Sequence, residues 1–285
     1  MPPSYIQLGP LTRTIANRAR WLYDDKFPAC QEWADEIARV LQHIYVNGKF
    51  DEFLPRLRDV DAKQRDAKLA EARVSFFFHR NSFRILAYDP PGSDGSEGDL
   101  LIQWGDTAPI FVEVKAPSWR GELFPRTEEA KRLLTPVQRE WILNRLRKPK
   151  DIDLEARWVD PAGQALDVVG RNALKKFFDD RPNLVVVADD FFVTAVGLPT
   201  LDAIAKAEMA DPEYNRVGGI LFFKPECYDA EIEYRIQYVD NPKALSSCSL
   251  PNAVRQGFTR STAQQKHPRR RRYGAGLRGF FNEGF

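Results

Sequence analysis

The stretch that decides the fold is Asp99–Lys115, which reads DLLIQWGDTAPIFVEVK. Two mostly apolar runs flank the triplet GDT at 105–107, whose residue types are typical of a tight turn. The pattern therefore predicts an antiparallel hairpin, and a three-residue loop sets a register in which Asp99 lies directly opposite Glu113. Directly opposed residues point to the same face of a sheet, whereas a shift of one residue would separate them.

Two charged residues interrupt the second strand of this hairpin. Side chains alternate along a strand, so Glu113 and Lys115 share one face. The other face is apolar and is expected to enter the core, with Ile110, Val112 and Val114. Ionised groups buried without partners destabilise a domain by several kcal/mol. A salt bridge on an edge strand, without any chemistry, is one explanation for these charges, and a reactive site is the other.

Two carboxylates that face each other repel, and a divalent cation between them removes the repulsion. Hard oxygen ligands suit Mg²⁺ or Mn²⁺, which proteins hold with one or two carboxylates and with phosphate oxygens of the substrate. Lys115 beside such a cation would offset negative charge and could hold or help deprotonate an attacking water. Asp99, Glu113 and Lys115 together therefore favour a site that hydrolyses phosphate esters.

Asp99 followed by Glu113-Val114-Lys115, on a hairpin preceded by a helix that carries Glu71, resembles the PD-(D/E)XK nuclease superfamily. The resemblance covers about Glu71–Pro117, and Gly98 stands where the superfamily name has proline. It implies an α/β restriction-endonuclease-like fold, a mixed β-sheet flanked by helices. It also implies that Asp99, Glu113, Lys115 and the helical Glu71 are catalytic, and that Asp99, Glu113 and Val114 bind the metal.

The hypothesis from these residues is a nuclease that depends on Mg²⁺ (or Mn²⁺) and cleaves phosphodiester bonds of DNA. DNA rather than RNA follows from the resemblance alone, so RNA stays open. The alternative is an inactive nuclease-like module that binds nucleic acid or a protein. A homo-oligomer, or a partner protein that supplies specificity, is compatible with either. The enzyme is favoured over the inactive module because Asp99, Glu113 and Lys115 are all present, whereas an inactive descendant commonly lacks at least one of the motif residues.

Nucleic-acid contacts are predicted at two places. The first directly follows the motif, at Ser118, Trp119 and Arg120, which could touch the backbone or stack on a base. The second is a basic run near the C-terminus, with Arg269, Arg270, Arg271 and Arg272. A surface turn and a solvated tail are the plainer interpretations of these two stretches. The resemblance also suggests an accessory glutamine or lysine on the helix after the third strand, and four candidates for that role stay open: Gln164, Asn172, Lys175 and Lys176.

The expected organisation is an N-terminal helical elaboration (1–50), a nuclease-like core (51–245) and an irregular basic C-terminal tail (246–285). Helices are predicted over about 12–45, from about 51 to 78 with a break near Asp61 as the alternative, and over 127–148 and 170–178. Strands are predicted over 83–88, 99–104, 108–115, 183–190, 219–223 and 231–239, the last with one wet face.

Composition sets the general class of the protein. Its 285 residues are 43% hydrophobic and 29% charged, with a formal net charge of +2, as in an ordinary globular protein. No apolar run approaches the roughly 20 residues that span a bilayer, and the start of the chain lacks a signal-peptide pattern. The three cysteines are scattered, without the spacing of a metal site. We therefore expect a cytoplasmic protein that does not interact with membranes.

Overall fold

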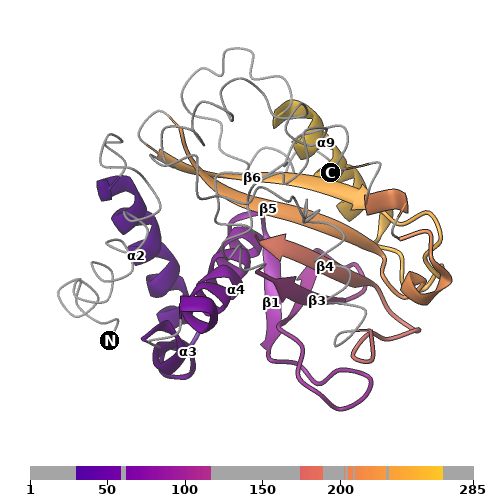
Figure 1. Ribbon diagram of the computed structural model, residues 1–285, viewed down its shortest axis with the longest axis horizontal. Helices are drawn as coiled ribbons and strands as arrows, with labels where there is room; N and C mark the ends of the chain where they lie inside the picture. The colour runs from indigo at the N-terminus through magenta and orange to yellow at the C-terminus, as the bar shows by residue number, and fades with distance from the viewer. Residues whose placement is uncertain are drawn as a thin grey trace, which may run out of the picture.

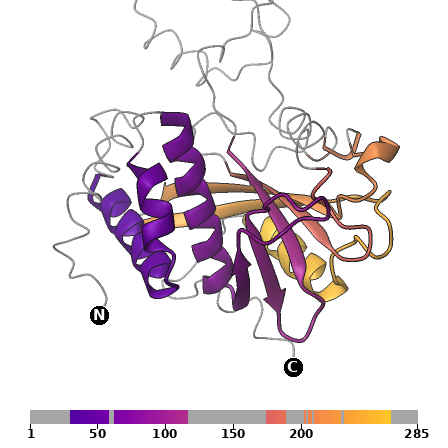
Figure 2. The same ribbon diagram turned by 90° about the horizontal axis from the view of Figure 1, so that it is seen from below.

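The computed structural model describes residues 30–58, 62–116, 174–188, 202, 205–207, 209–228 and 231–265. Within these ranges the chain is an α/β protein with one six-stranded sheet and helices packed against it. Figures 1 and 2 show three N-terminal helices gathered on one side of the molecule, and a C-terminal helix away from them beside the last two strands.

The N-terminal helices are α2 (Cys30–Val46), α3 (Phe50–Leu57) and α4 (Ala62–Arg80). Helix α2 ends at the predicted break, where Gly48 has a φ of +71°, a conformation that glycine adopts without strain. The single long helix expected after it is wrong, because α3 ends at Leu57 and α4 begins at Ala62, close to the alternative break near Asp61. The predicted helical residues 12–29 lie outside the described part of the chain.

The sheet is mixed and open, with strand order β1-β2-β3-β4-β5-β6. Its strands are β1 (Phe83–Tyr88), β2 (Leu100–Trp104), β3 (Ile110–Lys115), β4 (Asn183–Ala188), β5 (Gly219–Tyr228) and β6 (Glu231–Asp240). Strands β1 to β3 form an antiparallel meander, β3, β4 and β5 are parallel, and β6 returns antiparallel to β5. In the β2–β3 hairpin Leu100 pairs with Val112 and Ile102 with Ile110, which confirms the predicted register.

Each face of the sheet carries a hydrophobic core. On one face, Val112 and Val114 of β3 pack with Val74 and Phe77 of α4. On the other, Phe111 packs with Phe177 and with the chain between 205 and 222. A third cluster joins α2, α3 and α4 to one another. Because side chains alternate, β3 directs Val112 and Val114 to the first core, and directs Glu113 and Lys115 to the face of Phe111.

The expected irregular tail is wrong over part of its length, because helix α9 (Asn252–Gln265) follows β6. Its sequence is rich in Asn, Gln, Ser and Thr, so the helical period is weak. Val254 and Phe258 are nevertheless fully buried, and Phe258 stacks against Phe83 of β1 at 5.9 Å between ring centroids. Docking of these two side chains on the core stabilises a helix that local propensity does not predict.

Two further expectations also differ from the structure. Leu174–Phe178 forms a turn and an extended segment where the end of a helix was predicted. The wet face of β6 is present only in part: Glu233 is exposed, whereas Gln237 is 1% exposed. Neighbouring Val239 packs in the second core, so that core also covers the C-terminal half of β6. Among the helices of the described ranges, none has the length and apolar character needed to cross a bilayer.

Candidate active site

The hairpin register brings the side chain of Asp99 onto strand β3 beside Glu113. The backbone N–H of Asp99 donates to the carbonyl of Val112 at 3.3 Å, so pairing continues one residue past β2. The carboxylate of Asp99 in turn accepts a hydrogen bond from the backbone N–H of Val114, at 2.6 Å from Oδ2. The side chain of Val114 itself lies in the core, so only its backbone is available to the site. Asp99 and the Glu113–Val114 peptide are therefore adjacent, as the sequence predicts.

Glu113 is the most buried carboxylate of this group, with 1% of its surface exposed. Its Oε1 accepts hydrogen bonds from two ammonium groups, Lys115 Nζ at 2.5 Å and Lys176 Nζ at 3.0 Å. Its Oε2 is buried and has no hydrogen-bond partner among the residues that the structure describes. A buried carboxylate oxygen without a partner destabilises the fold by about 1–3 kcal/mol or more, and a cation bound at Oε2 would remove this cost.

The salt bridge between Glu113 and Lys115 that was weighed as a plain alternative is present, but its setting differs. Strand β3 is an inner strand, paired with β2 on one side and β4 on the other. The two lysine side chains are each 19% exposed, so the pair is mostly removed from water. Exposed pairs on an edge strand are nearly neutral in energy, whereas charges on an inner strand require compensation.

Glu71 reaches the same region from the middle of α4. It forms an ion pair with Lys68, one helical turn earlier, and its side chain is 13% exposed. Lys68 Nζ also lies 3.8 Å from Oδ1 of Asp89, the residue directly after β1. Burial raises the pKa of Glu71, and the carboxylate of Asp89 adds to this effect against the opposing influence of Lys68.

The pKa of Asp99 reflects its burial and the negative charges around it. It is raised from 3.8 to about 8, first by burial, then by the negative charges of Glu71 and Glu113. The hydrogen bond from Val114 and the charge of Lys115 act in the opposite direction. Burial and the neighbouring carboxylates therefore favour the protonated form of Asp99 while no cation is bound. Carboxylates that repel this strongly are suited to a divalent cation, which would take the place of that proton.

Sequence reasoning missed Asp89 and Lys68, and left Lys176 among four open candidates. Lys68 has a local signal, because it lies three residues before Glu71 on the same helix face. Asp89 has a φ of +49°, which few residues other than glycine adopt and which no sequence pattern indicates here. Lys176 meets Glu113 across 63 positions of the chain, so only the fold brings them together.

Several predicted residues cannot be placed. Ser118, Trp119 and Arg120 lie outside the described residues, as do the basic residues Arg269, Arg270, Arg271 and Arg272. The same holds for two of the accessory candidates, Gln164 and Asn172. Of the other two, Lys176 contacts Glu113, whereas Lys175 is exposed. Of the two candidates that the structure describes, Lys176 is therefore the one that contacts Glu113.

The carboxylates around Glu113 suit Mg²⁺ or Mn²⁺ only with help from other oxygen ligands. In the described ranges, no three or more His, Cys, Asp and Glu side chains are grouped closely enough to hold a metal ion by themselves. Two carboxylates are however sufficient for Mg²⁺, which keeps several waters and takes further oxygens from a phosphate substrate. Asp99 and the unpartnered Oε2 of Glu113 provide such a pair, so the donor set fits.

No protein-family model, no curated protein and no solved structure matches this chain. The functional assignment therefore depends on the geometry described above and on the short motif in the sequence.

Proposed function

We propose that this protein is a nuclease that depends on Mg²⁺ or Mn²⁺ and hydrolyses phosphodiester bonds of DNA. One observation carries the proposal: the carboxylate of Asp99 lies against the Glu113–Val114 peptide, while Oε2 of the buried Glu113 has no partner in the described part of the chain. Lys115 extends from the same strand to the other oxygen of Glu113. The two carboxylates would be the metal ligands that the motif predicts, and the lysine would be its third residue.

The finer fold assignment, restriction-endonuclease-like, belongs to the same proposal. Its support is the order of elements: helix α4, the antiparallel meander β1–β3, and then β4 parallel to β3. The motif residues come from the elements that the resemblance requires, with Glu71 on the helix and the others on the hairpin and its rim.

Each residue has a chemical role in this proposal. Asp99, Glu113 and the backbone of Val114 would hold the cation. When bound, the cation would polarise a phosphate oxygen and acidify a water. Lys115, whose ammonium is 2.5 Å from Glu113, is placed to donate a hydrogen bond to the attacking water or to the charge that develops on the phosphoryl group. Glu71 adds negative charge beside Asp99. Attack of the water oxygen on phosphorus would form the 5′-phosphate and break the bond to the 3′ oxygen, which would leave as a 3′-hydroxyl after taking up a proton, while the attacking water loses one.

The second candidate function is an inactive nuclease-like module that binds nucleic acid or a protein. The observation that favours it is charge compensation without any cation. Glu113 is paired with two lysines, Glu71 is paired with Lys68, and burial raises the pKa of Asp99 and so favours its neutral form. Such a cluster is close to neutral as it stands, so the distinction between the two functions has to come from an activity measurement.

The test is nicking of supercoiled plasmid in Mg²⁺, in Mn²⁺ and in EDTA, with a labelled RNA of matched length in parallel. We expect cleavage with either metal, none in EDTA, and none with Glu113→Gln or Lys115→Met. Glu233→Gln is the matched control, because Glu233 is an exposed carboxylate on β6, and it should cleave like the wild type. Cleavage that persists in either site variant would refute the assignment, and binding without cleavage in both metals would favour the inactive module.

A further inference from the structure

Lys176 is the second ammonium group on Glu113 and comes from a separate part of the chain. Its Nζ lies 3.0 Å from Glu113 Oε1, the same oxygen that Lys115 contacts at 2.5 Å. Lys115 reaches this oxygen from the same strand, two residues away, whereas Lys176 reaches it from the turn that precedes β4. A side chain on a turn keeps such a contact only if its backbone is fixed.

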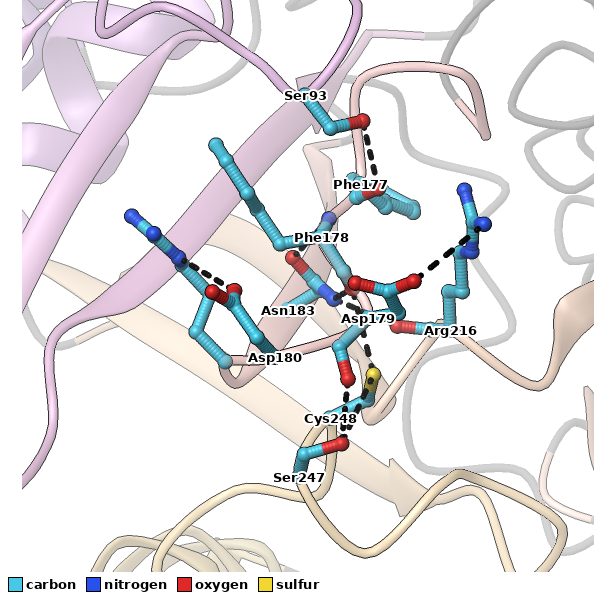
Figure 3. Close-up of polar contacts among 10 residues, drawn as sticks. Ser93, Phe177, Phe178, Asp179, Asp180, Asn183, Arg216, Ser247 and Cys248 are labelled. Atoms are coloured by element: carbon cyan, nitrogen blue, oxygen red, sulfur yellow. Dashed lines mark hydrogen bonds and ion pairs between the residues drawn. The ribbon is translucent and has the colours of Figure 1, made fainter.

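The loop between β1 and β2 fixes that backbone. The N–H of Ser93 donates to the carbonyl of Lys176 at 2.8 Å. The hydroxyl of Ser93 donates to the carbonyls on either side, at 2.5 Å for Lys175 and 2.9 Å for Phe177 (Figure 3 shows the latter contact). Gly92 packs so closely that a Cβ at its position would lie 2.8 Å from Cβ of Lys176. The loop thus binds three consecutive residues and leaves no room for a side chain at Gly92.

The other end of the segment is anchored to the body of the protein. Figure 3 shows Asn183 and Cys248 meeting at Phe178. The side-chain amide of Asn183 donates to the carbonyl of Phe178 at 2.7 Å, and the thiol of Cys248 donates to the same carbonyl at 3.3 Å. Phe177 is fully buried against Phe111 of β3, at 6.0 Å between ring centroids. Lys176 is therefore held between two fixed points and directed toward Glu113.

We infer that Lys176 is a positioning residue of the proposed nuclease site, set on Glu113 by the Gly92–Ser93 loop. Lys115 has to divide its ammonium donors between Glu113 Oε1 and the water or phosphate that it serves. Lys176 then remains on Oε1, and it keeps the unpartnered Oε2 directed at the cation. This inference rests on the proposed function, and it adds a residue to the site that acts through Glu113 rather than on the substrate.

The inference has a distinctive consequence, because Lys176 both orients Glu113 and repels a cation. Removal of its charge should tighten cation binding, since one unit of positive charge near the site is lost. The same removal should slow cleavage, because Glu113 loses the contact that fixes its direction. A residue with a merely structural role would weaken both properties together.

The experiment compares Lys176→Met with Lys175→Met, a neighbouring exposed lysine. Binding of Mn²⁺ to the free protein is measured by electron paramagnetic resonance, and plasmid cleavage is measured at saturating Mn²⁺. For Lys176→Met we expect the Kd for Mn²⁺ to fall about threefold to tenfold and the cleavage rate to fall about tenfold to a hundredfold. Lys175→Met should match the wild type in both measurements, and Lys176→Arg should restore most of the rate.

Gly92→Ala provides an independent variant that keeps the lysine but pushes against its Cβ. We expect changes in the same two directions, smaller than those of Lys176→Met, and circular dichroism melting verifies that each variant is folded. If Lys176→Met behaves like Lys175→Met, or loses Mn²⁺ affinity and rate together, the inference is wrong while the proposed function stands. If the wild type neither binds Mn²⁺ nor cleaves, the proposed function is wrong and the inference is overturned with it.

Discussion

Glu36 and Glu113 are equally buried, each with 1% of its surface exposed, but their surroundings differ. Glu36 lies on α2, and both of its oxygens are occupied. Arg73 of α4 donates to Oε1 and Oε2 at 3.0–3.2 Å, and the hydroxyl of Tyr234 on β6 donates to Oε1. Glu113 has two lysines on one oxygen and no described partner on the other.

Glu36 therefore serves to hold secondary-structure elements together, whereas Glu113 keeps one oxygen that the described part of the fold does not use. Around Glu36 the guanidinium is 3% exposed, and the network links α2, α4 and β6 across the core. It also raises the pKa of Tyr234 well above its ordinary value, through burial and the charge of Glu36. Around Glu113 the ammonium groups remain 19% exposed on flexible stems. A completed buried network fixes the fold, whereas an incomplete one retains free energy that a ligand can use.

The largest expected effect comes from Glu113→Gln, measured as plasmid cleavage under saturating Mn²⁺. Loss of the charge that would hold the cation should reduce the cleavage rate by about a thousandfold or more, roughly 4 kcal/mol of transition-state stabilisation. Glu36→Gln, the same substitution at the same burial, should cleave within about threefold of the wild type per folded molecule. A Glu113→Gln protein that cleaves within tenfold of wild type would remove the contrast between the two residues.

The second expected effect is on stability, where Glu36→Gln should be more harmful than Glu113→Gln. Glu36→Gln removes the buried negative charge that Arg73 and Tyr234 contact, so we expect a loss of about 3–5 kcal/mol in the free energy of unfolding. Glu113→Gln should lose less than about 2 kcal/mol, because Lys115 and Lys176 can turn toward water. Urea denaturation of both variants and the wild type, at pH 7 in EDTA, measures the difference. Equal losses would mean that Glu113 is as structural as Glu36.

The sequence predicts the hairpin well because its information is local. The GDT turn and the alternation of Ile110, Val112 and Val114 determine the register, and the structure has that register. The pairing of Asp99 with the Glu113 region follows from counting along the two strands. Strand β4 is similarly evident, since its short continuous apolar run, LVVVA at 184–188, is typical of a strand covered on both faces.

What the sequence does not reveal depends on contacts between distant segments. Helix α9 is polar along its length and forms because Val254 and Phe258 dock on the core. Lys176 was one of four candidates until the fold placed it on Glu113. Glu36, Arg73 and Tyr234 belong to three elements, so no spacing rule connects them. Pair interactions across the core are therefore beyond a reading of periodicity and turns.

The third prediction concerns Asp99, whose ionised form is disfavoured by burial and by the neighbouring carboxylates Glu71 and Glu113. Its pKa is about 8 in the folded protein and ordinarily 3.8, so the folded state holds a proton that the unfolded state releases between these values. Stability from this group is present below pH 4 and is lost as pH rises to 8. Asp99→Asn should therefore be more stable than the wild type. Its free energy of unfolding should be higher by about 2–4 kcal/mol at pH 9 and by less than about 1 kcal/mol at pH 4. Urea denaturation in EDTA at both pH values measures this gain, and a gain independent of pH would contradict it.

The smallest expected effect comes from His43 on α2, the helix that also carries Glu36. It gives the free energy of unfolding a pH dependence of opposite sign to that from Asp99. His43 lies on α2, and its Nε2 contacts the hydroxyls of Ser75 at 2.9 Å and Tyr88 at 3.3 Å. Asn47 approaches Nδ1 at 3.2 Å, and the ring of His79 lies at 4.9 Å. Burial, and then the charge of His79, lower the pKa of His43 from 6.5 to about 4.

The unfolded chain therefore binds a proton at His43 between pH 6.5 and 4 while the folded protein does not, so this contribution to stability is complete above pH 6.5 and is lost as pH falls to 4. We expect the free-energy difference between wild type and His43→Gln to shrink by about 1–3 kcal/mol over that interval. His79→Gln should reduce the change only slightly, because it removes the lesser cause. Imidazole titration by NMR gives the pKa of His43 directly. A value near 6.5 would mean that water enters the region of Ser75 and Tyr88, and that this part of the core is as open as the site around Glu113.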